Sequence, residues 1–245
     1  MTEDRRPVIP DLAPESPRER LKQAAAKAAV EHVKSGMVLG LGTGSTTRYA
    51  VHEIIRRWQA GTLVDVVGVS TSERTTAQAA EHGFPIEPLE AHAAIDLAID
   101  GADEVLHTDG AFFLIKGLGG ALLREKAVEL RARRFVVISD DSKRVTRLGT
   151  RSPVPVEVAI DHWQREQEWL AGLQCQPRLR KEESPYVTDN GNYILDCHFE
   201  GGIDDPRGLA ARLDERDAVQ AHGLFLDMAT DVILAAEDGI EILTR

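Results

Sequence analysis

Short apolar runs alternate with helical patterns through residue 139 of the chain. Helical spacing is clearest after residue 45, where Tyr49, Ala50, Ile54 and Trp58 recur on one face. Runs of the kind that form buried parallel strands stand at 37–42, 63–69, 95–99 and 135–139. Strands that alternate with helices predict βαβ units and a parallel sheet.

The alternation of strand-like and helical patterns ends at Arg151-Ser152-Pro153-Val154-Pro155, which we interpret as a linker or edge segment. The pattern beyond it predicts the order β-α-β-β-α-β of a ferredoxin-like split unit. The predicted elements are a strand at 156–158, a helix at 161–170, a strand at 177–180, a hairpin of 186–188 with 193–198 around Asp189-Asn190-Gly191-Asn192, a helix at 206–213 and a strand at 223–226. The run 232–236 predicts one more strand, which returns to the first domain.

Residues 1–15 are predicted to form a flexible leader. A helix begins after Ser16, because Ser16-Pro17-Arg18-Glu19 forms a capping box with proline at the first helical position. We therefore predict an α/β protein. A Rossmann-like parallel-sheet domain spans 16–150 and 228–245, and a smaller ferredoxin-like α+β domain, 151–227, is inserted near the C-terminus.

Composition and charge narrow the classes of partner. The 245 residues carry 29 Lys and Arg against 40 Asp and Glu, a net charge of −11, so nucleic acid and anionic membranes are unfavourable partners. Cys175, Cys197 and the eight histidines show no metal-ligand or disulfide spacing. No secretory signal or membrane-spanning run stands out, so we predict a cytoplasmic protein without a metal site.

The first candidate for chemistry is the glycine-rich loop Gly40-Leu41-Gly42-Thr43-Gly44-Ser45-Thr46-Thr47, between a predicted strand and a predicted helix. Its glycines let the backbone approach an anion, and the helix that follows presents free N–H groups. The loop is a candidate phosphate site; a tight turn capped by Thr43 or Ser45 would use the same residues. A dinucleotide site is the weaker interpretation, because the spacing is GxGxG rather than GxGxxG.

Two carboxylates follow the predicted strand 95–99, within Asp100-Gly101-Ala102-Asp103-Glu104. The carboxyl ends of parallel strands face the ligand crevice of an open α/β sheet. Asp100 and Asp103, one Gly-Ala step apart, can therefore converge on one ligand. The alternative interpretation is a solvated acidic turn.

The third segment, Lys116-Gly117-Leu118-Gly119-Gly120, precedes a predicted helix at 121–132. Lys116 can place a positive charge beside the N–H groups of the loop. Glu125 falls about one helical turn later, although Arg124-Glu125-Lys126 by itself is typical of a solvated helix face. Lys143, which follows the strand 135–139, is a further candidate anion contact.

These segments, in this order, resemble the ribose-5-phosphate isomerase A family. The resemblance rests on GTGST at 42–46, DGADE at 100–104, KG.G.ALLREK at 116–126, DxSK at 140–143, PVEV at 155–158, and TDNGN with ILD at 188–196. It implies a Rossmann-like domain with the active site and a ferredoxin-like domain used in subunit association, in a homodimer or homotetramer. It further implies reversible isomerisation of D-ribose 5-phosphate and D-ribulose 5-phosphate through a cis-enediolate, in the non-oxidative pentose phosphate pathway, without metal or organic cofactor.

The resemblance also implies residue roles. Glu125 matches the family's general base. The chemistry of the implied reaction also needs a positive charge near the oxyanion, for which Lys116 is our choice, and an acid-base group for ring opening, for which Asp100 or Asp103 is suitable. The implied substrate-binding residues are Thr43, Gly44, Ser45 and Thr46, then Asp100, Gly101, Ala102 and Asp103, then Lys116, Gly117, Leu118 and Gly119, and finally Lys143. Lys22 aligns with a phosphate-side lysine. Leu118 departs from the all-glycine run usual in the family.

Other functions are compatible with parts of this pattern. Sugar-phosphate deaminases, lactonases and coenzyme A transferases have related α/β architectures, and fold alone does not separate them. A transferase would use a glutamate as nucleophile and form a thioester. A non-catalytic sugar-phosphate sensor is a rival of another class, but the sequence offers no helix-turn-helix unit or basic stripe.

Overall fold

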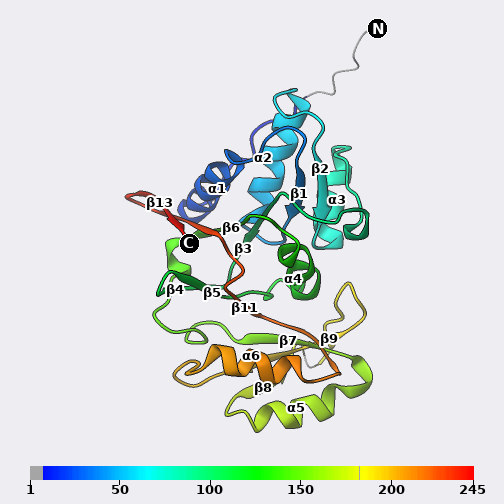
Figure 1. Ribbon diagram of the computed structural model, residues 1–245, viewed down its shortest axis with the longest axis vertical. Coiled ribbons are helices and arrows are strands. Elements are labelled where there is room, and N and C mark those ends of the chain that lie inside the picture. Colours follow the sequence, from blue (N-terminus) through cyan, green and yellow to red (C-terminus); the bar gives the residue numbers. More distant parts are fainter. Residues whose placement is uncertain (1–7, 182) are drawn as a thin grey trace. The chain divides into compact units, whose positions relative to one another are not determined.

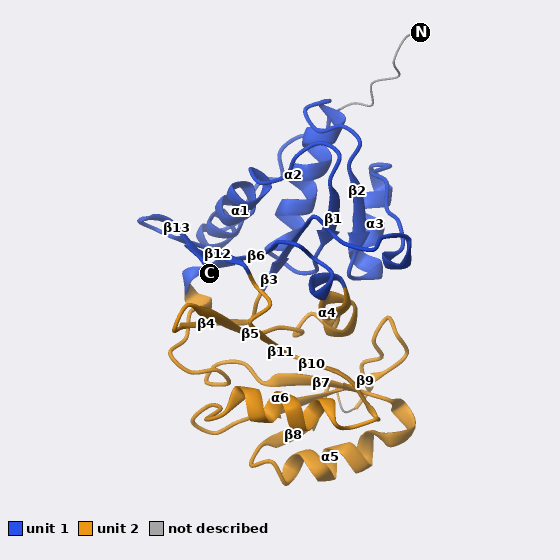
Figure 2. Cartoon of the chain, in the orientation of Figure 1, with its two compact units in different colours: residues 1–101, 128–141, 230–244 blue, residues 102–127, 142–229, 245 orange. Residues whose placement is uncertain are grey.

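A computed structural model of the chain describes residues 8–181 and 183–245. The chain divides into two compact units, which Figure 2 colours separately. Unit 1 comprises the described residues up to 101 together with 128–141 and 230–244, and unit 2 comprises 102–127, 142–229 and 245. No helix in the described part of the chain is long and apolar enough to cross a membrane.

Unit 1 contains a six-stranded sheet in the order β13-β12-β6-β3-β1-β2 (Figure 1, with β12 labelled in Figure 2). The five parallel strands are β1 (Val38–Leu41), β2 (Val67–Ser70), β3 (Leu97–Gly101), β6 (Phe135–Asp140) and β12 (Asp231–Ala236). Strand β13 (Gly239–Thr244) pairs antiparallel with β12 at the edge. The predicted parallel sheet is confirmed, and so is the return of residues 232–236 to it.

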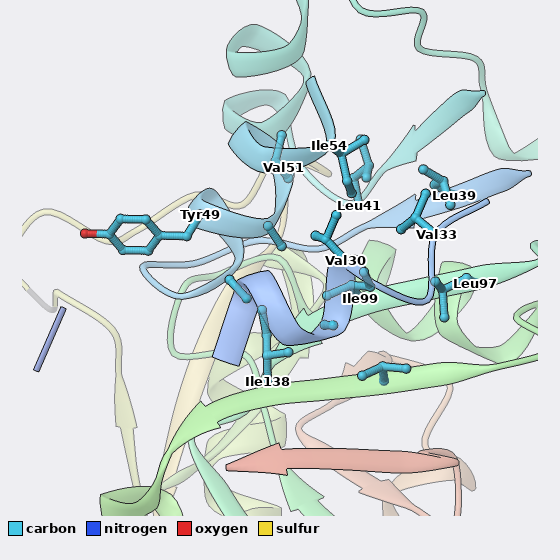
Figure 3. Close-up of a cluster of buried hydrophobic side chains, with 14 of the residues drawn as sticks. Val30, Val33, Leu39, Leu41, Tyr49, Val51, Ile54, Leu97, Ile99 and Ile138 are labelled. Carbon is cyan, nitrogen blue, oxygen red and sulfur yellow. The ribbon is translucent and has the colours of Figure 1, made fainter. Parts of the chain in front are cut away.

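The helices of unit 1 follow the patterns that predicted them. They are α1 (Pro17–Val30), α2 (Thr47–Gln59) and α3 (Glu73–Glu81), with a short 3-10 helix, η1 (Leu89–Ala91). The Ser16 hydroxyl accepts a hydrogen bond from the Glu19 N–H at 3.2 Å, as one half of the predicted capping box, whereas the Glu19 carboxylate accepts from the Glu15 N–H at 2.8 Å. Helix α1 packs on α2, β6 and β12. The resulting core joins Val30, Leu41, Ile54 and Ile99 (Figure 3).

The segment 8–15 is attached to unit 1. The Ile9 N–H donates to the Gln59 side chain at 2.9 Å, and Lys27 and Asp11 form an ion pair at 2.6 Å. The side chains of Ile9 and Leu12 pack against the core of the unit. These contacts order a segment that the sequence pattern assigned to a flexible leader; residues 1–7 lie outside the described residues.

Unit 2 contains the ferredoxin-like order that the sequence predicted. Its elements are β7 (Val154–Val158), η3 (Ile160–His162), α5 (Trp163–Ala171), β8 (Gln176–Leu179), β9 (Tyr193–His198), α6 (Pro206–Asp214) and β10 (Val219–His222). The strands form an antiparallel sheet in the order β10-β7-β9-β8. Helix α5 packs on β8 and β9, and α6 packs on β10.

Two details of this prediction were wrong. Residues 186–188 form no strand, and β9 pairs with β8 and β7 instead. The turn itself exists, because Gly191 has a φ of 78° and the Thr188 N–H donates to the Asn192 carbonyl at 2.9 Å. The strand predicted at 223–226 is β11 (Leu224–Leu226), which belongs to another sheet.

That other sheet has three antiparallel strands in the order β11-β5-β4. Strands β4 (Glu104–Thr108) and β5 (Ala111–Ile115) form a hairpin that the sequence analysis did not predict. Helix α4 (Leu122–Leu130) and the 3-10 helix η2 (Asp141–Lys143) follow along the chain. Residues 102–127 and 142–150, which the sequence assigned to the first domain, are therefore grouped with unit 2.

Candidate active site

Asp100, at the end of β3, is fully buried and organises the glycine-rich loop of unit 1. Its Oδ1 accepts hydrogen bonds from the Thr43 N–H at 3.0 Å, the Thr47 hydroxyl at 2.9 Å and the Gly101 N–H at 2.6 Å. Charge-assisted bonds of this kind are about twice as strong as neutral ones. The interpretation of Asp100 as part of a solvated turn is therefore wrong.

Gly42 is required by the close approach of Asp100. A Cβ atom at Gly42 would lie 2.1 Å from the Asp100 carboxyl carbon. Because β1 and β3 are neighbouring parallel strands, the loop after β1 and the end of β3 lie at the same edge of the sheet. The order of the strands in the sheet thus explains how GTGST and DGADE meet at Thr43 and Asp100.

The Thr43 side chain belongs to a buried hydroxyl cluster that sequence reasoning missed. Its Oγ1 lies 2.7 Å from the hydroxyls of both Thr71 and Ser72, and 3.2 Å from that of Thr75. These three residues follow β2 or begin α3. The run Ser70-Thr71-Ser72 directly after a strand was the available signal, since it places hydroxyls beside the neighbouring loop.

The rest of the loop faces a cavity within unit 1. Gly44 has a φ of 142°, and Thr46 precedes α2 without making a side-chain capping bond. The exposed Ser45 hydroxyl accepts a hydrogen bond from Lys22 of α1 at 2.8 Å. The cavity has a volume of about 370 Å³ and is lined by Leu12, Gly44, Ser45, Arg48, Arg74, Thr75 and Gln78. Hydroxyls, cations and a helix N-terminus suit an anion such as phosphate.

The centre of the candidate site in unit 2 is a buried ion pair. Lys116 follows β5, and its Nζ lies 3.6 Å from Oε2 of Glu125, with side chains only 2% and 3% exposed. The Lys116 ammonium also lies 5.4 Å from the centroid of the buried Phe225 ring. Two opposite charges at this distance interact strongly because little water screens them.

The burial of Glu125 corrects the interpretation of residues 124–126 as a solvated helix face. Leu122 and Val128, both buried, lie three residues before and three residues after Glu125 on α4. Positions three apart share one face of a helix. Glu125 therefore lies on the apolar face of α4, and this spacing was the signal in the sequence.

Asp103 holds the glycine-rich segment after Lys116. The carboxylate accepts a hydrogen bond from the Leu118 N–H at 3.0 Å, and the Asp103 N–H donates to the Ile115 carbonyl at 2.7 Å. Gly117 is buried with a φ of 104°, whereas Leu118 and Gly119 are exposed. The Lys116 N–H donates to the Gly223 carbonyl at 2.9 Å.

The remaining predicted residues lie beside these groups along the chain. Gly101 and Ala102 are half-buried between Asp100 and Asp103, and Lys143 is half-buried at the end of η2. Within residues 8–181 and 183–245, no three His, Cys, Asp or Glu side chains form a group that could hold a metal ion.

Comparisons with known proteins agree on one family. The family model described as ribose 5-phosphate isomerase A (phosphoriboisomerase A) matches residues 67–239. Ribose-5-phosphate isomerase A of Synechococcus sp. (strain JA-3-3Ab) is 51% identical over 229 residues, which cover 93% of this chain and 98% of the relative. The probable ribose-5-phosphate isomerase 3, chloroplastic, of Arabidopsis thaliana is 47% identical over 232 residues, or 92% of this chain and 83% of the relative.

A solved structure is similar over nearly the whole chain. It is a D-ribose-5-phosphate isomerase in complex with phospho-erythronic acid, with a TM-score of 0.88 and 39% identity, and the match covers 94% of this chain and 100% of that one. These likenesses, in a chain with the sheet and loops described above, place the protein among the isomerases. More particularly, the chain belongs to the ribose-5-phosphate isomerase A family.

Proposed function

We propose that the protein interconverts D-ribose 5-phosphate and D-ribulose 5-phosphate. The observation that carries this proposal is the buried pair of Lys116 and Glu125, with 3.6 Å between ammonium and carboxylate. Aldose-ketose isomerisation needs one base that moves a proton between C1 and C2, and one positive group near the oxygen that becomes negative. The similar isomerase solved with phospho-erythronic acid, a phosphorylated sugar acid, supports this class of substrate.

In this proposal Glu125 takes the proton from one carbon of the sugar and returns it to the other through a cis-enediolate. A positioned base typically accelerates such a step by about 10² to 10⁴. Lys116 stabilises the enediolate oxygen, and its burial strengthens this interaction because water is excluded. Glu125 begins and ends the cycle as a carboxylate. A second proton passes from the hydroxyl on C2 to the oxygen on C1; in this proposal the Lys116 ammonium donates to the one oxygen and recovers a proton from the other, so the protons balance.

The remaining residues take the roles of binding and ring opening. Thr43, Gly44, Ser45 and Thr46, with Lys22, bind the phosphate group. Asp103 is our choice for acid-base catalysis of ring opening, since Asp100 already accepts three hydrogen bonds as the anchor of its loop. The segments Gly101–Ala102 and Gly117–Gly119, together with Lys143, bind the sugar.

An assay of the chelator-treated protein with ribose 5-phosphate tests the proposal. We expect ribulose 5-phosphate to form, and in deuterated water we expect deuterium at C2 of recovered ribose 5-phosphate. Incubation with an acyl-coenzyme A and hydroxylamine, both removed before the assay because hydroxylamine also condenses with the sugar carbonyl, should leave the rate unchanged, since the mechanism has no glutamyl thioester. Folded protein that forms no ketose above background would contradict the proposed function, and inactivation by hydroxylamine that requires the acyl-coenzyme A would favour a transferase.

We further propose that the chain acts in the non-oxidative pentose phosphate pathway, in the cytoplasm, as a homodimer or homotetramer. The domain boundaries of this proposal, 16–150 with 228–245 and 151–227, differ from those of the two compact units, which group residues 102–127 and 142–150 with the second unit. Light scattering coupled to size-exclusion chromatography tests the assembly: a monomer at micromolar concentration would contradict it.

A further inference from the structure

Arg180, which follows β8, connects strand β9 with the loop that carries Lys116. Its Nε and Nη2 donate to the two carboxylate oxygens of Asp196 at 2.9 and 2.5 Å. Its Nη1 donates to the carbonyl oxygens of Gly117 at 3.1 Å and Leu118 at 3.2 Å. One guanidinium therefore binds the carboxylate on one side and two consecutive carbonyls on the other.

The lysine-glycine loop, residues 116–120, depends on contacts of this kind. Glycines place few limits on backbone conformation, and Gly117 has a φ of 104°. The Leu118 N–H is held by Asp103 and the Gly117 and Leu118 carbonyls by Arg180. The peptide group between Gly117 and Leu118 is thus fixed through both its N–H and its carbonyl, and the next carbonyl is held as well.

The charge and shape of Arg180 suit this task. The side chains of Arg180 and Asp196 are only 11% and 17% exposed, so their ion pair is less screened than a surface pair. The planar guanidinium has five donors in a fixed fork, which can serve a carboxylate and carbonyls together. A lysine ammonium at this position would keep the charge but lose the fork.

A second residue of the same segment packs against the end of the loop. A Cβ atom at Gly120 would lie 2.4 Å from the Tyr186 hydroxyl, so the ring lies directly on this glycine. The Tyr186 N–H donates to the Arg180 carbonyl at 3.0 Å. The chain after β8 therefore contacts the loop at Gly117, Leu118 and Gly120.

We propose that Arg180 and Asp196 are positioning residues for the isomerase reaction. They hold the lysine-glycine loop in the conformation that keeps the Lys116 ammonium 3.6 Å from Glu125. The inference rests on the proposed function, and it assigns a catalytic consequence to two residues of the ferredoxin-like sheet region. Arg180 acts through the carbonyls of Gly117 and Leu118, and Asp196 acts by orienting Arg180.

The first test is the turnover of Arg180→Ala. We expect kcat to fall about 10-fold to 100-fold, the size of effect that a misplaced catalytic group produces. Added guanidinium ion at millimolar concentration should restore part of this kcat, whereas sodium chloride at equal ionic strength should not. Arg180→Lys should recover less than half of the wild-type kcat.

Arg216→Ala is the matched control. Arg216 makes the same two-bond pair with the buried Glu166, at 2.8 Å for both bonds, and stacks on Trp169 in the same unit. Its loss removes a comparable ion pair, whose hydrogen bonds among the described residues go to Glu166 and not to residues 116–120. We expect its kcat to stay within about twofold of wild type, without guanidinium rescue.

Hydrogen-deuterium exchange separates this inference from the proposed function. Peptides that cover 116–121 should exchange faster in Arg180→Ala and Asp196→Asn than in wild type, whatever reaction the protein catalyses. In Arg216→Ala these peptides should exchange at the wild-type rate. Unchanged exchange in both loop variants would overturn the inference. So would equal losses of kcat in Arg180→Ala and Arg216→Ala, or a loss in Arg180→Ala that guanidinium does not relieve.

Discussion

Glu125 shows how one residue can carry two conflicting signals in a sequence. Its charge and its neighbours Arg124 and Lys126 suggest solvent, while its spacing from Leu122 and Val128 puts it on the buried face of α4. Burying a carboxylate costs free energy unless a partner offsets the loss of hydration, and Lys116 supplies that partner at 3.6 Å. A buried charged pair beside a glycine-rich loop is the arrangement expected of a catalytic group.

The substitution Glu125→Gln tests the role of this carboxylate. It keeps the size of the side chain but removes the proton acceptor, so kcat should fall by at least about 10² while the substrate still binds. Turnover and solvent-deuterium incorporation, followed by NMR, measure this loss.

Glu129→Gln is the control for that experiment. Glu129 is also buried on α4, at 3% exposure and one turn further along the helix. We expect its kcat to stay within about tenfold of wild type, well above that of Glu125→Gln. Near wild-type turnover in Glu125→Gln would assign the proton transfer to another residue, and Asp103 would be tested next.

The residues of the candidate site could be predicted from the sequence, but their burial and partners could not. The order of the loops and the resemblance named Asp100 and Glu125, because loops after parallel strands are the expected positions for chemistry. The hydroxyl cluster around Thr43 and the contacts of Arg180 join segments far apart in sequence. No local pattern encodes such pairings, since they depend on strand order and on register.

Among the elements, α2 owes part of its stability to charges at its last turn. Glu53, only 4% exposed, accepts hydrogen bonds from Arg56 and Arg57, each at 2.7 Å. Burial alone raises the pKa of Glu53, but the two guanidinium groups outweigh it and lower the pKa from 4.5 to about 2. A carboxyl group whose pKa is lowered by folding stabilises the folded state at pH values above its pKa in the unfolded chain. This stabilisation is lost as the pH falls and the group is protonated.

The free energy of unfolding should therefore depend on Glu53 in acid. As the pH falls from 5 to 2, wild type should lose up to about 3 kcal/mol more stability than Glu53→Gln, from a pKa difference of about 2.5 units. Urea unfolding at each pH, followed by circular dichroism, measures the difference. Parallel pH profiles of the two proteins would show that the ion pairs of Glu53 with Arg56 and Arg57 contribute nothing to the free energy of unfolding.

Glu104 anchors the segment that the sequence analysis interpreted as a linker. This fully buried residue of β4 accepts hydrogen bonds from the N–H groups of Gly149 at 2.7 Å, Arg151 at 2.6 Å and Ser152 at 2.6 Å. The interpretation of DGADE as a solvated acidic turn is therefore wrong for Glu104 as well. The bonds also explain why residues 142–150 are grouped with unit 2.

Removing this anchor should destabilise the fold. Glu104→Ala leaves three donors without their acceptor, at about 1–3 kcal/mol each, so we expect a loss of at least about 3 kcal/mol. Glu104→Gln keeps one acceptor oxygen, so its free energy of unfolding should lie between those of wild type and Glu104→Ala. Chemical denaturation measures both variants, and a Glu104→Ala protein within 1 kcal/mol of wild type would contradict this role.

The elements that could be predicted were those with a clear period or clear caps. Helix α1 had its capping box, and the buried parallel strands were continuous apolar runs. The hairpin of β4 and β5 was missed because β4, Glu104–Thr108, mixes charged and polar residues with apolar ones, so the apolar run of β5, Ala111–Ile115, had no recognisable partner strand. The prediction of a strand at 186–188 was wrong for another reason. A turn at Gly191 specifies that the chain reverses direction, but it does not specify which strand pairs with β9.

At the scale of the whole molecule, the path of the chain decides which parts depend on one another. Unit 1 is built from three separate stretches, and β12 completes its parallel sheet from the far end of the sequence. Asp231 at the start of β12 accepts hydrogen bonds from Arg134 at 2.8 and 3.1 Å. The sequence indicated this return only through one apolar run, 232–236.

Truncation should therefore have very different effects on β12 and β13. Strand β13 is an exposed edge, with Ile240 and Ile242 at 46% and 54% exposure, so a chain ending at residue 238 should still unfold cooperatively at a lower Tm. A chain ending at 229 also loses β12, whose residues 232–235 are at most 2% exposed. Three of these side chains, Val232, Ile233 and Leu234, contribute about 1.5–3 kcal/mol each when buried, and together they approach the total stability of a typical domain. We expect this second protein to show no cooperative thermal transition of unit 1 by calorimetry; a transition matching that of the 238-residue chain would mean that the sheet forms without β12.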